Sequence, residues 1–393
     1  NIKRKETCDN WLPNYHTRLE MQFIDLHRQY ERIEEKINHG FQEVLAHKRF
    51  IMGDEVISLE KRLSEYVGVK HVICCASGTD ALVIPLLAYD LKKEDAIFVP
   101  SFTFFASAES VSIAGGTPVF VDCDETYNMS IESLSQAIEK VKKEGELSPK
   151  GVIAVDLFGL PANHTDIQKI ADRNNLFVIE DGAQGFGGKI GEHKACSFGD
   201  VAATSFFPAK PLGCYGDGGA IFTNNDDLAN QIKSIHIHGQ GVDKYDNIQI
   251  GINSRLDTLQ AVVLDAKLDI FDEELVLRNK VAEYYKEELK SDIAVPVIPN
   301  GFYSSWAQFT LKSVDEKEKN KILSALTENS IPSAIYYPTP AHMSTAYSSL
   351  RQNQIALPQT ESVCKRVFSI PMHPYLKETE IEQICEVIKK AVK

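Results

Sequence analysis

The sequence predicts an α/β protein with a mostly parallel β-sheet, helices on both faces of that sheet, and a smaller α/β domain after it. From residue 71 to residue 237, short apolar segments alternate with helix-forming segments. Such continuously apolar segments are typical of parallel strands that are buried on both faces. The chain has 393 residues, of which 43% are hydrophobic and 25% are charged. At about 150 residues per domain, this suggests two domains or three.

The expected elements follow one another along the chain. Apolar residues at three- and four-residue steps predict a first helix over 23–44, and a second helix covers 54–67. The strands are expected at 71–75, 96–99, 118–121, 151–155, 176–179, 201–207 and 220–222. The helices between and after them are expected at 77–87, 103–114, 131–142, 165–174 and 226–237. Residues 257–289 are expected to form one long helix or two.

Three parts of the chain are expected. Residues 1–20 are polar and lack periodicity, so we interpret them as an N-terminal extension; residues 21–270 form the large domain. Residues 271–393 form a small C-terminal α/β domain. Its elements are expected at 306–314 (strand), 316–329 (helix), 333–337 (strand-like) and 378–392 (helix).

Charge and composition exclude several classes of function. The net charge of −13 and the pI near 5.4 argue against nucleic acids and anionic membranes as partners. The sequence has no signal peptide and no run of about 18 apolar residues that could span a bilayer. Its eight cysteines are scattered without a CxxC pair, which favours reduced thiols in a cytoplasmic protein.

The segment 205–219 holds the strongest candidate for catalysis. Pro208 and Pro211 flank Lys210 and prevent a regular helix, and four glycines follow at 213, 216, 218 and 219. Apolar residues on both sides predict a tight loop between two buried strands. A desolvated lysine in such a loop has a lowered pKa and can act as an amine nucleophile. The alternative is an ordinary surface lysine.

Polar groups also follow other predicted strands. Ser77, Gly78 and Thr79 lie where a strand meets a helix, a position that favours anion binding; alternatively, Thr79 or Asp80 only caps the helix. Asp181 and Asp156 each follow a buried strand, where a carboxylate needs a partner such as a protonated pyridine nitrogen. The residues themselves leave both acids open, and for each of them the alternative is a loop cap.

Two further patterns have less chemical content. The aromatic residues at 102, 104 and 105 follow a strand and are more typical of a core than of cofactor stacking. His236 and His238 have no third ligand at a suitable spacing, so we expect no metal site.

Taken together, the chain resembles the fold type I pyridoxal 5'-phosphate (PLP) enzymes, and more narrowly the nucleotide-sugar aminotransferases of the DegT/StrS group. The resemblance extends from about residue 22 to the C terminus. The segments that carry it are 23–26, 76–81, 100–103, 180–184, 205–210, 251–256 and 369–374. Gly182 departs from the pattern, because relatives usually have alanine there; we expect no consequence.

The resemblance implies a role for each candidate residue. Lys210 would carry PLP covalently, and Asp181 rather than Asp156 would keep the pyridine nitrogen protonated. Gln184 would bond the phenolic oxygen of the cofactor, and Phe104 would stack on its ring. The residues implied for the phosphate are Gly78, Thr79 and Ser205, with Asn253 from the second subunit of a homodimer with shared active sites. Alternatively, Asn253 only caps the long helix of its own chain.

The resemblance also implies a reaction. Glutamate would donate an amino group, through PLP, to a keto-sugar nucleotide. A sister branch of the family has histidine in place of this lysine and catalyses dehydration, so Lys210 places the chain with the aminotransferases. The segment 206–220 most resembles enzymes that aminate UDP-2-acetamido-2-deoxy-3-oxo-glucuronate for bacterial surface polysaccharides such as O-antigen. The alternatives are another UDP- or dTDP-linked 3-keto or 4-keto hexose and, in a different class, a PLP-binding regulator without activity. Expected substrate contacts are Arg255, Tyr336, Tyr337 and His342.

Overall fold

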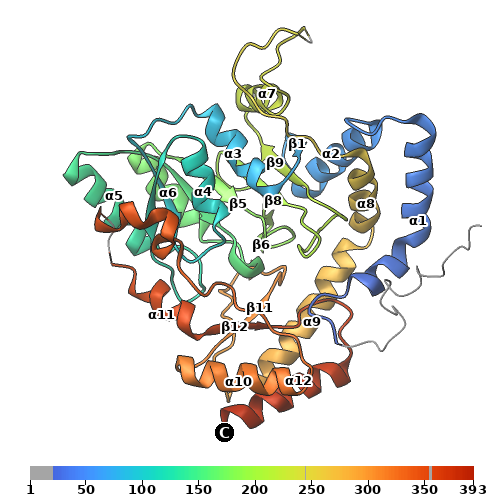
Figure 1. Cartoon of the computed structure of the whole chain (residues 1–393), viewed down its shortest axis with the longest axis vertical. Coiled ribbons are helices and arrows are strands. Elements are labelled where there is room, and N and C mark those ends of the chain that lie inside the picture. The colour runs from blue at the N-terminus through green and yellow to red at the C-terminus, as the bar shows by residue number, and fades with distance from the viewer. Residues whose placement is uncertain (1–20, 244, 354–355) are drawn as a thin grey trace, which may run out of the picture.

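A seven-stranded sheet forms the centre of the molecule in the computed structural model, which describes residues 21–243, 245–353 and 356–393 (Figure 1). The expected extension, residues 1–20, lies outside the described residues. The strand order is β1-β9-β8-β5-β4-β2-β3. The strands are β1 (His71–Cys75), β2 (Asp95–Pro100), β3 (Thr117–Val121), β4 (Ser148–Val155), β5 (Phe177–Asp181), β8 (Val201–Ser205) and β9 (Gly219–Thr223). Only β9 runs against the others, which confirms the mostly parallel sheet.

Helices cover both faces of this sheet. In β4, Ile153 and Val155 join one core cluster, and Val152 and Ala154 join another on the opposite face. The first face is covered by α3 (Gly78–Ala88), α4 (Ala106–Ile113) and α7 (Asp226–Ile235). The second face is covered by α5 (Ile131–Glu144), α6 (His164–Asn174), α2 (Asp54–Val67) and α8 (Thr258–Leu268). The continuous apolar strands predicted from the sequence are therefore buried on both sides.

Side-chain caps explain where several helices begin. Ser77, Ser130, Asn163 and Asn225 each accept a hydrogen bond from a backbone N–H in the first turn of the helix that follows. Asp25 does the same for α1 (Leu26–His47), which therefore starts later than expected. The stretch after residue 257 forms two helices, because α8 ends at Leu268 and α9 runs over Phe271–Leu289.

The C-terminal part builds a smaller α/β unit, drawn in orange and red at the bottom of Figure 1. Its strands β11 (Phe309–Lys312) and β12 (Val367–Ile370) pair antiparallel, and α9, α10 (Glu316–Glu328) and α12 (Glu378–Val392) share a core with them. We keep the division at 270/271 as a proposal.

The strand expected at 333–337 was wrong, because the segment forms a single bridge, between Ala334 and Ser369. Pro332 and Pro338 flank it and lack the N–H groups that a longer ladder needs. The α11 helix (Pro358–Arg366) was not predicted.

The remaining short elements are η1 (Leu157–Gly159), β6 (Lys189–Ile190), β7 (His193–Lys194), β10 (Phe302–Tyr303), η2 (Ala341–Met343) and η3 (Thr345–Asn353). In the described part of the chain, no helix is long and apolar enough to cross a membrane.

Candidate active site

Two neighbouring strands place Lys210 and Asp181 at the same edge of the sheet. Asp181 is the last residue of β5 and pairs with Ala203 of the parallel strand β8. Lys210 lies in the loop that follows β8. The carboxyl ends of parallel strands are where α/β proteins bind ligands, so this edge is the candidate site.

The loop that carries Lys210 closes on itself, as its prolines and glycines predicted. Cys214 N donates to Phe206 O at 2.8 Å, and Lys210 N donates to Phe207 O at 2.9 Å. A Cβ atom at Gly213 would lie 2.6 Å from the carbonyl oxygens of Phe207 and Pro208, so only glycine fits there. The loop therefore holds the lysine in one place between two buried strands.

The amine of Lys210 is surrounded by protein atoms, and the charge of the Asp181 carboxylate acts on it. Desolvation lowers the pKa of Lys210, and the negative charge of Asp181 opposes this shift. A lysine with a lowered pKa has more of the neutral amine at neutral pH, which is the form that attacks a carbonyl. The interpretation of Lys210 as an ordinary surface lysine does not fit this environment.

Asp181 is held by two hydrogen bonds and is only 4% exposed. Ser107 Oγ donates to its Oδ2 at 2.7 Å, and Ala183 N donates to its Oδ1 at 3.2 Å. Burial raises the pKa of Asp181, and these two bonds and Lys210 oppose the rise. Ser107 was missed by the sequence analysis, because a serine inside a helix gives no signal that it faces an acid 74 positions away.

Gln184, a residue expected to bind the cofactor, contacts Tyr337, a residue expected to bind the substrate. Its Oε1 accepts from Phe158 N at 2.6 Å, and its Nε2 donates to Tyr337 Oη at 2.9 Å. The ring of Tyr337 lies 6.1 Å from that of Phe104, which is 58% exposed. The expectation that these aromatic residues belong to the core holds for Phe102, at 1% exposed, but was wrong for Phe104.

The N terminus of α3 forms the third part of the site. Ser77, and not Thr79 or Asp80, caps the helix, because its Oγ accepts from Asp80 N at 3.1 Å. The N–H groups of Gly78 and Thr79 have no partner within the helix, as at any helix N terminus, so they can bind an anion. Gly78 packs on Ser205, where an added Cβ would lie 2.5 Å from the Ser205 Cβ. The three residues predicted to bind phosphate thus meet.

Ser254 ties a distant loop to this helix start. Its Oγ donates to Asp80 Oδ2 at 2.6 Å and accepts from Ala76 N at 3.1 Å. The sequence analysis missed this role, although Ser254 lies in a segment that carries the resemblance. Its neighbour Asn253 is exposed, and the residue that precedes α8 as its cap is Asp257. The alternative that Asn253 caps α8 was therefore wrong.

The four expected substrate residues lie in different places. Tyr336 packs against Tyr337, with ring centroids 5.7 Å apart, and so lies next to the site. The His342 ring faces Ser101 Oγ at 2.6 Å and the Glu361 carboxylate at 3.6 Å, at the end of β2. Arg255 follows Ser254, whose N–H donates to His236 O at 2.9 Å, so this part of the loop lies near His236. The described contacts therefore link Tyr336 and Tyr337, but not Arg255 or His342, to Gln184.

The arrangement fits PLP. It offers an amine in a desolvated loop, a buried carboxylate for the pyridine nitrogen, an amide donor, an exposed aromatic ring and a helix N terminus for the phosphate. Together with the sheet topology, these groups fit the class of PLP-dependent enzymes of fold type I.

Comparisons with known proteins identify the family. The model of the DegT/DnrJ/EryC1/StrS aminotransferase family matches residues 31–389, and the chain belongs to this family. It is 43% identical to a UDP-2-acetamido-2-deoxy-3-oxo-D-glucuronate aminotransferase of Pseudomonas aeruginosa, over 94% of this chain and 99% of that protein. An aminotransferase of the same family from Brucella abortus has 49% identity and a TM-score of 0.91, over 94% of this chain and 99% of that one.

A further solved structure bears on the cofactor. NtdA of Bacillus subtilis was crystallised with the bound cofactor PMP, the amino form of PLP. It is 28% identical and has a TM-score of 0.83, over 94% of this chain and 83% of that chain. PLP is the cofactor of this family.

Proposed function

We propose that the protein transfers an amino group from glutamate to UDP-2-acetamido-2-deoxy-3-oxo-glucuronate, for surface polysaccharide synthesis in bacteria. The observation that carries the reaction is the desolvated amine of Lys210 at the same edge of the sheet as the buried carboxylate of Asp181, whose charge acts on it. The sugar rests on the relative from Pseudomonas aeruginosa, whose name states this substrate. The alternative sugars are other UDP- or dTDP-linked keto hexoses.

The residues divide the work between binding and proton transfer. PLP, when bound, supplies an electron sink that stabilises negative charge on the carbon next to the transferred nitrogen. Lys210 binds the cofactor between turnovers and, once free, moves the proton to and from the sugar carbon as general acid and base. Asp181 holds a proton at the pyridine nitrogen, because a buried carboxylate stabilises the adjacent cation.

The other residues orient the bound molecules. Gln184 is fixed by Phe158 N and Tyr337, so its amide can orient the phenolic oxygen of the cofactor. Phe104 offers an exposed ring for stacking, and Gly78, Thr79 and Ser205 bind the phosphate. Tyr336 and Tyr337 contact the sugar. Arg255 and His342 remain proposed substrate contacts that would need movement of the substrate loops or a second subunit.

We further propose a homodimer with shared sites. Asn253 is exposed, and its neighbour Ser254 is hydrogen-bonded to Asp80 at the start of α3, near the residues proposed to bind the cofactor phosphate. From this position Asn253 can reach a second subunit. Ile51 bridges Asp257, so the exposed residues Phe50, Ile51 and Met52 lie next to this loop. Exposed apolar residues beside a polar donor suit an interface between two copies related by a two-fold axis.

Two other proposals complete this function. A cytoplasmic location is supported by the seven cysteines of the described residues, which are all free and buried. A PLP-binding regulator without activity is not favoured, because a binding site alone needs no amine of lowered pKa next to an acid.

The test is transfer of labelled nitrogen. The purified protein with PLP is incubated with ¹⁵N-glutamate and the 3-keto uronate nucleotide, and the sugar product is analysed by mass spectrometry. We expect ¹⁵N in the sugar and 2-oxoglutarate in equal amount, and neither with Lys210→Ala. Binding of PLP without any transfer to a panel of keto-sugar nucleotides would refute the proposed reaction and favour a regulator.

A further inference from the structure

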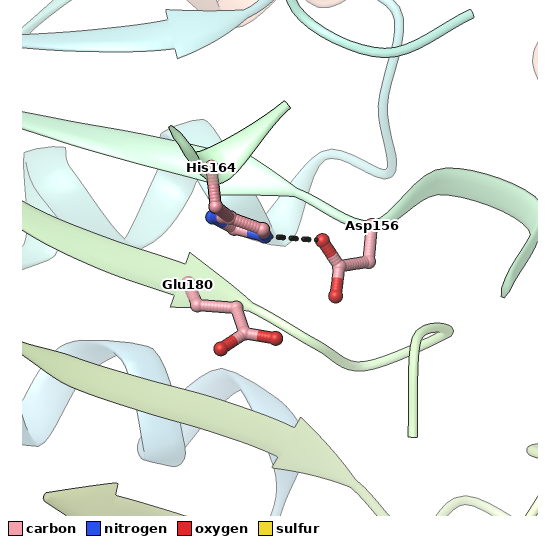
Figure 2. Close-up of side chains that lie close together, drawn as sticks. All are labelled: Asp156, His164 and Glu180. Carbon is pink, nitrogen blue, oxygen red and sulfur yellow. Dashed lines mark hydrogen bonds and ion pairs between the residues drawn. The ribbon is translucent and has the colours of Figure 1, made fainter. Parts of the chain in front are cut away.

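Three buried titratable residues, Asp156, His164 and Glu180, lie close together (Figure 2). Asp156 follows β4, Glu180 lies in β5 and His164 begins α6, and one ligand atom from each lies within 4.8 Å of the others. Asp156 and Glu180 are fully buried, at 0% exposed. Glu180 precedes Asp181 in the same strand, so the two side chains point to opposite faces of the sheet. The cluster therefore lies outside the set of residues that face PLP.

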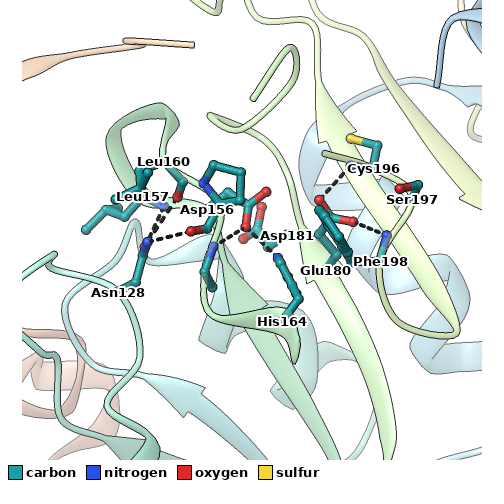
Figure 3. A network of polar contacts seen from close by, with 12 residues as sticks. Asn128, Asp156, Leu157, Leu160, His164, Glu180, Asp181, Cys196, Ser197 and Phe198 are labelled. Carbon is teal, nitrogen blue, oxygen red and sulfur yellow. Dashed lines mark hydrogen bonds and ion pairs between the residues drawn. The ribbon is translucent and has the colours of Figure 1, made fainter. Parts of the chain in front are cut away.

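One carboxylate oxygen of the cluster lacks a hydrogen-bond donor, as the contacts around it show (Figure 3). Both oxygens of Glu180 accept backbone hydrogen bonds, from Cys196 N at 2.5 Å and from Phe198 N at 2.8 Å. Asp156 Oδ1 accepts from Ala162 N at 2.9 Å and from His164 Nε2 at 2.8 Å. Asp156 Oδ2 has no donor among the described residues, and it points toward the Glu180 carboxylate in Figure 2.

Two ionised carboxylates in such a place are costly, because both lose hydration and they repel each other. A proton on Glu180 removes one charge and supplies the donor that Asp156 Oδ2 lacks. We propose that Asp156 and Glu180 share a single proton, and that this pair is a positioning device for the turn that carries Asp181 and Gln184.

The charges around the pair agree with one shared proton. Burial raises the pKa of Asp156 to about 7 and that of Glu180 well above its usual value. Burial lowers the pKa of His164, which favours the neutral form of its ring, and the negative charge of Glu180 opposes this shift. The negative charge of Asp181 also acts on Asp156, and the buried thiol of Cys196, whose pKa burial raises, lies near both acids of the pair. In such coupled acids the proton belongs to the pair.

Two contacts connect the pair to the active-site turn. Asp156 N donates to Asp181 O at 3.0 Å, so one member of the pair also fixes the backbone of the acid proposed to face the cofactor. Asp156 Oδ2 lies against Gly185, where an added Cβ would be 2.3 Å away. Gly185 follows Gln184, so a movement of Oδ2 displaces this glutamine. The positioning part of the inference rests on the proposed roles of Asp181 and Gln184; the shared proton does not.

Asp156→Asn is the decisive variant. The Asn amide puts an N–H where the proton was, leaves Glu180 ionised, and keeps the same net charge and the same acceptors for Ala162 and His164. Infrared difference spectra of the full-length protein report protonated carboxyl groups directly. They are recorded at about pH 8, because a single buried acid such as Glu60 is mostly ionised at that pH. We expect a protonated-carboxyl band in the wild type that is absent in D156N and retained in the control E60Q. E180Q should also lose the band.

Positioning is read from the bound cofactor. D156N should keep the wild-type absorbance spectrum of the PLP-loaded protein and its pH titration, whereas Asp156→Ala, which removes the acceptor, should shift both.

The absence of a protonated-carboxyl band in the wild type, or a band retained in both D156N and E180Q, overturns the shared proton. One equivalent of a tightly bound divalent metal by elemental analysis also overturns it, because a cation then balances the two carboxylates. A D156A spectrum that equals the wild type overturns the positioning role. The infrared result does not depend on activity, so it stands apart from the proposed reaction.

Discussion

Ser107 donates a hydrogen bond to Asp181, with 2.7 Å between Oγ and Oδ2, and its own Oγ lies 3.0 Å from Thr103 Oγ1. This bond opposes the rise in pKa that burial imposes on Asp181. The helix α4, which is remote in sequence, thus favours the ionised form of the acid at the end of β5. The acid must be ionised to stabilise a protonated pyridine.

Ser107→Ala tests this relationship. Loss of the bond raises the pKa of Asp181 further, so the acid limb of the pH–rate profile should move to higher pH. We expect kcat to fall about ten-fold at neutral pH, since a hydrogen bond to a charged group is worth about 1.5–3 kcal/mol. Ser107→Thr should restore the profile. Ser110→Ala, which removes a bond to a backbone oxygen in the same helix, is the control. An unshifted acid limb in S107A would contradict the role.

Lys210 should carry the cofactor covalently. Borohydride reduction of the PLP-loaded protein, followed by peptide mapping, should find the pyridoxyl group on Lys210. Lys194 is a demanding comparison, because burial also lowers its pKa and its amine lies 3.5 Å from the centre of the Tyr66 ring. Lys210→Ala should abolish labelling, and Lys194→Ala should leave it intact. Label on Lys194 or Lys189 in the wild type would refute the assignment.

The dimer with shared sites can be tested by complementation. Lys210→Ala and Asn253→Asp chains, each impaired alone, are unfolded together, refolded and assayed. Shared sites give hybrid dimers with one intact site, so activity should rise well above the mean of the parents. Lys210→Ala mixed with Asp181→Asn is the matched control, because both changes affect groups that one chain supplies, and it should give no gain. Equal results for both mixtures would mean that each site is built from one chain.

The uronate substrate should be preferred over its neutral counterpart. Paired 3-keto nucleotides, with a carboxylate or a hydroxymethyl group at the sugar C6, are compared by kcat/KM. We expect at least about ten-fold preference for the uronate, from hydrogen bonds to its charge. Tyr336→Phe and Tyr337→Phe should reduce this preference if their hydroxyl groups contact the carboxylate. A preference for the neutral sugar would refute the uronate and leave aminotransfer intact.

Glu60 should make stability depend on pH. Burial raises its pKa from 4.5 to about 7, although Cys74 N donates to it at 2.8 Å. The folded protein holds this proton more tightly than the unfolded chain, so the stability it contributes is full below about pH 4.5 and is lost as pH rises through about 7.

Glu60→Gln removes this dependence. Between about pH 4.5 and pH 7, the free energy of unfolding of the wild type should fall by about 2 kcal/mol relative to the variant, after allowance for partial solvent exposure. Urea unfolding across this range measures it. Glu65→Gln, an exposed change in the same helix, is the control and should follow the wild type. Parallel curves for wild type and E60Q would show that Glu60 is ionised in the folded state.

Much of the fold and part of the site could be predicted from local patterns. Continuous apolar segments predicted the strands, because burial on both faces of a parallel sheet demands them over only a few residues. Lys210 could be found because two prolines and four glycines within a few positions define its loop. The choice of Asp181 over Asp156 needed the resemblance to a family, since both acids follow buried strands in the same way.

The sequence by itself determined which residues sit at strand ends, and only the tertiary structure decided which of them meet. Ser107 and Asp181 are 74 positions apart, and Asp80 and Ser254 are 174 apart. Both contacts depend on the order of the strands in the sheet and on the packing of helices over it. The spacing of apolar residues along the sequence gives neither of these. The 333–337 segment fails to extend its single bridge for a similar reason, because pairing depends on a partner and on the flanking prolines. The proton between Asp156 and Glu180 arises only when β4 and β5 lie side by side and bury both acids.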